Sequence, residues 1–127
     1  RSNKIVVGSS GVASTNKQRN DTIAACTNLK SLITLMNPEK KCNYKLYLRD
    51  LENASHSTIL FSQHSSTVNA KKISSWIQLC LAMVDNSAKF RAPRALLQSR
   101  SVEEQFDALF QHVVKNEELY RFYVGRR

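Results

Sequence analysis

Cys42, His56 and His64 are the side chains that metal chemistry would draw on first. A structural zinc site uses closely spaced pairs of Cys or His ligands, which hold the ion in a tetrahedral cage. These three residues match no such spacing and no fourth ligand is evident. We therefore expect no metal site and no cofactor, and we interpret both histidines as polar surface residues.

Two pairs of acids could supply general acid–base chemistry: Asp50 with Glu52, and Glu103 with Glu104. The first pair falls in a polar turn and the second in the first turn of an expected helix, where acids interact favourably with the helix dipole. His112 lies beside an apolar helical stripe and is interpreted as a helix-face residue. No nucleophile motif, phosphate-binding loop or dinucleotide-binding glycine run is present, so we expect no enzymatic activity.

The chain is strongly basic, with 19 basic and 10 acidic residues in 127 and a net charge of +9. Such a charge favours an acidic or polyanionic partner. The charge is also uneven, because residues 86–100 carry no acid while residues 101–118 carry five acids and one lysine. One hypothesis is a basic nucleic-acid-binding domain that contacts phosphates, with a viral origin left open. Its contact residues would be Lys89, Arg91, Arg94, Arg100 and Arg121.

Length and composition indicate one domain over residues 1–127, with 1–3 and 125–127 as flexible ends. The hydrophobic fraction of 42% is enough for a core. Three widely spaced cysteines argue against a disulfide framework and favour a reducing compartment. Cys26 and Cys80 fall on apolar helical stripes and are interpreted as buried thiols.

Hydrophobic periodicity predicts strands and helices in alternation. We expect strands over 4–7, 44–48 and 58–61, with a short one near Phe90. Helices are expected over 17–36, from the Thr67–Lys72 region to Asn86, and from Ser101 onward. Capping-box spacing marks possible starts at Thr15 and Ser101, although Asn20 or Asp21 could equally cap a later start of the first helix. The tail, 119–124, reads as an edge strand or as more helix.

The second of these helices has an unusually wide apolar surface. Ile73, Trp76, Ile77, Cys80 and Val84 form its stripe, and Leu79, Leu81 and Met83 widen it. A helix that is apolar on most sides is expected to be sandwiched between other elements. Strands interspersed with helices in this way predict a layered α/β domain.

Four segments, taken in order, resemble a BRCT domain, an interaction module of DNA-damage and chromatin proteins. Residues 4–11 are similar to the first strand and the Ser-Gly that follows it, and 55–62 to the third strand. Residues 67–71 resemble the opening of the second helix, and 90–99 the fourth strand running into the third helix. The chain departs from the family at 37–41, where a Gly-Gly turn is usual.

The resemblance implies a small central, mainly parallel sheet flanked by about three helices. It also implies a non-enzymatic, nuclear protein-interaction module of chromatin, telomere or repair assemblies, docking an acidic or phosphorylated peptide on a basic face. Phosphate would be held by Ser9 or Ser10, the backbone at Gly11, and Lys71 or Lys72. The alternative is that both lysines are solvated residues of a helix start. A third hypothesis is an oligomerising domain that self-associates through 119–124.

Overall fold

The computed structural model describes residues 15–40, 44–89 and 101–126. The chain divides into two compact units, 1–64 and 65–127, and each is described by itself. The expectation of a single domain over 1–127 stays a prediction. None of the described helices is both long enough and apolar enough to cross a membrane.

The first unit begins with two short helices, α1 (Asn16–Ala24) and α2 (Leu29–Met36). The capping box at Thr15 is confirmed, because its hydroxyl accepts from the Gln18 N–H at 3.2 Å and the Gln18 side chain accepts from the Thr15 N–H. The expectation of one helix over 17–36 is wrong. Asn28 interrupts it, since its side-chain oxygen accepts from the Ser31 N–H at 2.8 Å and starts a new helix.

A very short hairpin-like sheet follows in the same unit. Strand β1 (Leu46–Tyr47) pairs antiparallel with β2 (Leu60–Phe61), with Leu46 opposite Phe61, and the 3₁₀ helix η2 (Arg49–Glu52) lies between them. The side chain of Asn37, which is fully buried, joins the end of α2 to β1. It donates to the Leu46 carbonyl at 2.9 Å and accepts from the Leu48 N–H at 2.8 Å.

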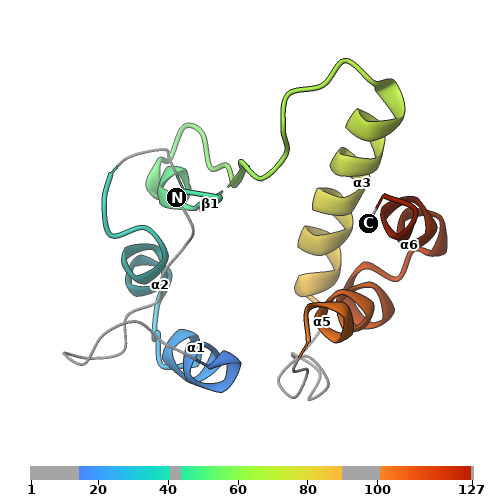
Figure 1. The fold of residues 1–127 in the computed structure, drawn as a ribbon. Helices are drawn as coiled ribbons and strands as arrows, with labels where there is room; N and C mark the ends of the chain where they lie inside the picture. The colour runs from blue at the N-terminus through green and yellow to red at the C-terminus, as the bar shows by residue number, and fades with distance from the viewer. Residues whose placement is uncertain (1–14, 41–43, 90–100, 127) are drawn as a thin grey trace. The chain divides into compact units, whose positions relative to one another are not determined.

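The regular secondary structure described in the second unit is all helical. It contains α3 (Ala70–Ser87), α5 (Val102–Leu109), the π-helical turn η3 (Phe110–Val114) and α6 (Glu117–Val124). The turn η3 and α6 both pack against α3 (Figure 1). The core of this unit is formed by Leu79, Phe110, Val114 and Leu119, with Trp76, Met83 and Phe106 among the partly buried residues around it.

Polar side chains set the boundaries of these helices. Asn69, Ser101 and Asn116 each accept a hydrogen bond from a backbone N–H in the first turn of α3, α5 and α6 respectively, and Ser101 forms the expected capping box with Glu104. Lys115 ends η3 in the left-handed region, with φ of 51°. This turn lets α6 run back along the core.

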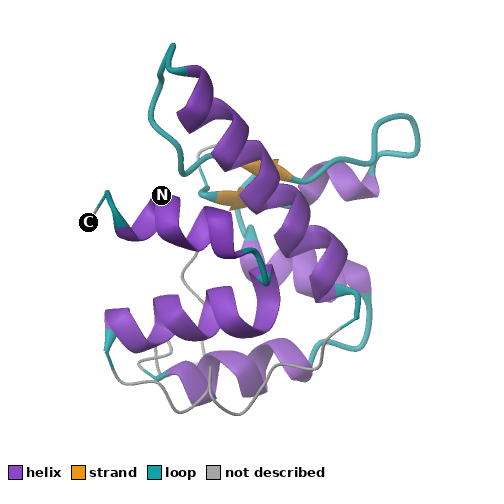
Figure 2. Ribbon diagram, turned by 90° about the vertical axis from the view of Figure 1, so that its right-hand side faces the viewer, coloured by secondary structure: helices purple, strands orange, loops and turns teal. Residues whose placement is uncertain are grey.

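The predicted α/β fold with a central, mainly parallel sheet is wrong for the described residues. They are mostly helical, and their two strands are short and antiparallel (Figure 2). The segments 44–48 and 58–61 do form paired strands, but each strand has only two residues. The 3₁₀ helix η2 and irregular chain occupy the residues between the two strands. The expected strands at 4–7 and near Phe90 lie outside the described residues, and the tail 119–124 belongs to α6.

Candidate interaction surface

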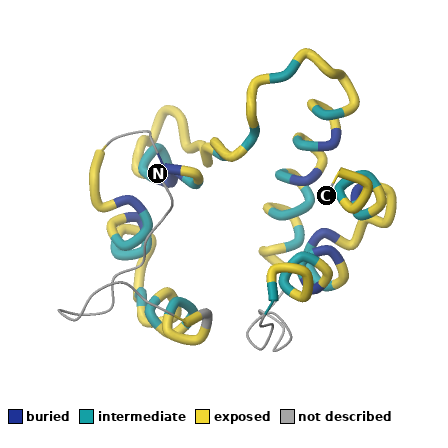
Figure 3. Tube along the Cα trace, viewed as in Figure 1, coloured by how far each residue is buried: buried dark blue, intermediate teal, exposed yellow. Residues whose placement is uncertain are grey.

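Helix α3 carries apolar side chains on two opposite faces. One face is packed within the unit, where Leu79 is buried and Trp76 and Met83 are partly buried against the core. The opposite face carries Ile73, Ile77, Leu81 and Val84, which we call the α3 stripe. Their spacing of three or four residues places them in line along one side of the helix. Buried and exposed positions both occur along α3 in Figure 3.

The α3 stripe is exposed. Its four residues retain between 41% and 58% of their accessible surface. Within the described residues of its own unit, α3 is therefore packed on one face only, and the expectation that this helix is sandwiched stays a prediction. The physical reason is that η3 and α6, the described elements that pack most closely on α3, cover the Leu79 side alone. The sequence showed that the helix is apolar nearly all round, but not which face would find a partner.

The packed face holds α3 firmly in its unit. Asn86, near the C-terminus of the helix, donates from its side chain to the Val113 carbonyl at 2.8 Å. Lys71, in the first turn, forms an ion pair with Glu118 of α6 at 2.8 Å. The stripe is therefore presented by a helix that is tied to η3 near its C-terminus and carries an exposed ion pair to α6 near its N-terminus.

The residues of the predicted phosphate site are only partly described. Ser9, Ser10 and Gly11 lie outside the described residues, so their position relative to α3 stays a prediction. The Lys71 ammonium donates to the Glu118 carboxylate, and this hydrogen bond and charge lower the pKa of Glu118. Lys72 follows it in the first turn, where its backbone N–H donates to the Asn69 side chain at 3.0 Å. Lys71 is thus an exposed helix-start residue that pairs with Glu118, and its part in a phosphate site stays a prediction.

The cations of the predicted nucleic-acid contact are also divided. Arg91, Arg94 and Arg100 lie outside the described residues. Lys89 is exposed just beyond α3. The guanidinium of Arg121 pairs with Glu117 one turn earlier on α6, at 3.1 Å. The structure therefore brings none of the described members of this set together.

Side chains with metal-ligating or thiol chemistry remain scattered. Within the described ranges, no group of three or more His, Cys, Asp or Glu could hold a metal ion, and Cys42 falls outside those ranges. Cys26 and Cys80 are free thiols that are half-buried rather than fully buried. Burial raises the pKa of Cys80, which disfavours its reactive thiolate.

Comparisons with known proteins found no family model, curated protein or solved structure that matches this chain. They neither support nor refute the resemblance to BRCT domains. The parallel sheet that the resemblance implies is contradicted by the described residues.

Proposed function

We propose that this protein is a non-enzymatic interaction module whose α3 stripe binds an acidic, amphipathic helix of a partner protein. The observation that carries the proposal is the line of four large, exposed apolar side chains on one face of an 18-residue helix. Single exposed apolar residues are ordinary on protein surfaces. A line of them at helical spacing is the pattern that an amphipathic partner helix matches with its own anchors.

The rigidity of α3 supports this function. Its opposite face is packed on the core, and the Asn86 side chain ties its C-terminal end to η3. A surface that is already ordered costs less conformational entropy when it binds. Covering the exposed part of the stripe would contribute on the order of 1 kcal/mol for each side chain.

The net charge decides between two partners that could cover the stripe. A second copy of the chain would also carry a charge of +9, and the two copies would repel each other. An acidic partner is instead attracted and steered toward the protein. Lys89 follows the C-terminal end of α3, where an acid of the partner helix can approach it.

The proposal is tested with a fluorescently labelled helical peptide, about as long as α3, with leucines at helical spacing and glutamates elsewhere. We expect saturable binding in fluorescence anisotropy, and much weaker binding of a scrambled peptide with the same composition. The double variant Ile77→Ser, Leu81→Ser should bind about tenfold more weakly or worse, because it removes two central anchors. Both residues are exposed, so the fold should be retained, which far-UV circular dichroism would verify.

Leu29→Ser provides the matched control. Leu29 is also about half exposed, but it lies on α2 in the other unit, so its loss should leave the affinity unchanged. Equal affinity for the scrambled peptide, or unchanged binding by the double variant, would overturn the proposal. A concentration-dependent mass that the double variant abolishes would also overturn it, in favour of self-association.

The nucleic-acid hypothesis stays a prediction, because most of its cations lie outside the described residues and Arg121 pairs with Glu117. No described feature favours it over a protein partner.

A further inference from the structure

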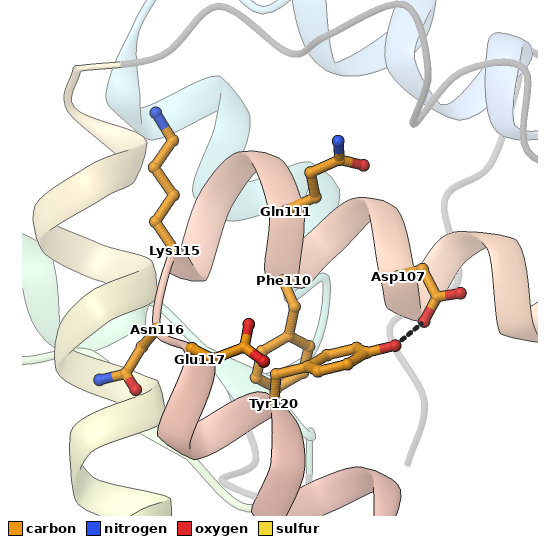
Figure 4. Close-up of a pocket in the computed structure, with 7 residues that line it drawn as sticks. All are labelled: Asp107, Phe110, Gln111, Lys115, Asn116, Glu117 and Tyr120. Atoms are coloured by element: carbon orange, nitrogen blue, oxygen red, sulfur yellow. Dashed lines mark hydrogen bonds between the residues drawn. The ribbon is translucent and has the colours of Figure 1, made fainter.

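A pocket of about 420 Å³ lies in the second unit, where η3 turns into α6 (Figure 4). Two features of the backbone create it. The π-helical turn widens the chain at Phe110–Val114, and such turns occur frequently at functional sites. Lys115 then adopts its left-handed conformation and reverses the chain, so that the start of α6 faces the end of α5 across the pocket.

Aromatic rings form one wall of the pocket. Phe110 is buried, and its ring meets the Tyr120 ring edge-on with centroids 5.7 Å apart. Phe106 packs on the same two rings, at 4.7 Å from Phe110 and 5.9 Å from Tyr120. The Tyr120 hydroxyl donates to the Asp107 carboxylate at 3.1 Å. These contacts hold the Tyr120 ring in place before any ligand arrives.

Two carboxylates, those of Asp107 and Glu117, also line the pocket. Asp107 accepts the hydrogen bond from Tyr120, and the structure shows no ion pair to it from the described residues. Glu117 also lines the pocket (Figure 4), and its carboxylate accepts from the Arg121 guanidinium at 3.1 Å. The Lys115 side chain extends from the rim away from the Tyr120 ring. The pocket therefore places the Tyr120 ring beside the Asp107 carboxylate.

Amide groups complete the lining. Gln111 and Asn116 each contribute a side chain to the pocket, and an amide oxygen can accept hydrogen bonds. Within 101–118, the segment that supplies most of this lining, acids outnumber basic residues five to one. Of the charged residues that line the pocket, Asp107 and Glu117 are acidic and Lys115 is basic, and Asp107 is the acid that contacts Tyr120.

We propose that this pocket binds the guanidinium group of an arginine side chain presented by a basic peptide. A guanidinium is planar and always charged, so it can stack on the Tyr120 ring while it donates to the Asp107 carboxylate. The volume exceeds that of one long side chain and lies within the range of ordinary ligand pockets. A phosphate or an acidic peptide would be repelled by the same carboxylates.

The test uses short peptides that differ at one position. Binding of Gly-Arg-Gly amide is followed by NMR through the ring signals of Tyr120 and Phe110, and compared with the citrulline peptide, a neutral mimic of the same shape. We expect the arginine peptide to bind about tenfold more tightly than the citrulline peptide, because the charge is the difference between them. A lysine peptide should be intermediate, since it cannot stack a planar group.

Asp107→Asn is the decisive variant, because it removes the charge and keeps the size of the side chain. It should weaken arginine binding about tenfold. Glu103→Gln is the matched control, since it makes the same charge change on α5 at an exposed position outside the pocket. Equal binding of arginine and citrulline peptides, unchanged binding by Asp107→Asn, or equal losses in both variants would overturn the proposal. The Ile77→Ser, Leu81→Ser protein should bind arginine normally, so failure of one proposal is distinguishable from failure of the other.

Discussion

The side-chain amide of Asn86 donates to the carbonyl oxygen of Val113 at 2.8 Å, and this bond joins the end of α3 to the π-helical turn. The same amide also lies 3.4 Å from the Val114 carbonyl. A π-helical turn leaves carbonyls without their usual helical partners, and Asn86 supplies a donor to them. The Asn86 amide therefore connects α3, which carries the α3 stripe, to η3, which lines the proposed guanidinium pocket.

Replacing Asn86 should loosen this connection. Asn86→Asp removes the donor and places carboxylate oxygens against the carbonyls, so we expect the free energy of unfolding to fall by about 1–3 kcal/mol. Chemical denaturation of the variant would measure the loss. Gln78→Glu is the control, because it makes the same chemical change at an exposed position of α3. A loss no larger than that of the control would show that the Asn86 bond is not a structural tie.

Asn37 should be the most sensitive polar position of the first unit. It is completely buried, and its side chain satisfies the Leu46 carbonyl and the Leu48 N–H. Asn37→Leu fills a similar volume but leaves both groups unpaired, so we expect a loss of about 2–4 kcal/mol. Hydrogen exchange of the Leu48 amide would report the change locally, because that proton would lose its acceptor.

Asn53→Ala serves as the comparison for Asn37. Its side chain accepts from the Ser55 N–H at 3.0 Å but is exposed, so water can replace the bond. We expect a change below about 1 kcal/mol. Similar losses at Asn37 and Asn53 would contradict the structural role assigned to the buried amide.

Local signals in the sequence predicted the helix starts that depend on neighbouring residues alone. Thr15 with Gln18 and Ser101 with Glu104 form the expected capping boxes, because this motif is complete within four residues. Asn28 and Asn116 also begin helices, yet both lie inside stretches whose apolar pattern continues through them. An asparagine caps a helix only where the preceding helix has ended, and tertiary packing determines where that happens.

Burial was harder to infer from the sequence than helix position. The pattern on α3 correctly indicated a helix, but its two apolar faces are equivalent in sequence and one of them is exposed. The pocket gave no motif at all, because it depends on a π-helical turn and on a lysine in a left-handed conformation. Neither feature can be predicted from local sequence, because both depend on tertiary contacts. The alternating patterns did mark two paired strands, but each strand has only two residues, so the sequence pattern predicted a larger sheet than the described residues form.

The ion pair between Lys71 and Glu118 should make the stability of the folded protein depend on pH. Lys71 lowers the pKa of Glu118 in the folded protein, chiefly by donating a hydrogen bond and also by its charge. A carboxyl group whose pKa is lower in the folded state stabilises that state above its unfolded pKa, and the contribution is lost as the pH falls through the folded pKa. Lys71→Ala should therefore return the Glu118 pKa toward its usual value, and an NMR titration of the Glu118 side chain would measure it. Lys72→Ala should leave that pKa lowered; an unchanged titration in Lys71→Ala would rule out the pairing. A phosphate held by Lys71 would place a second negative charge beside Glu118, so phosphate binding at this position would raise the Glu118 pKa in the wild-type protein.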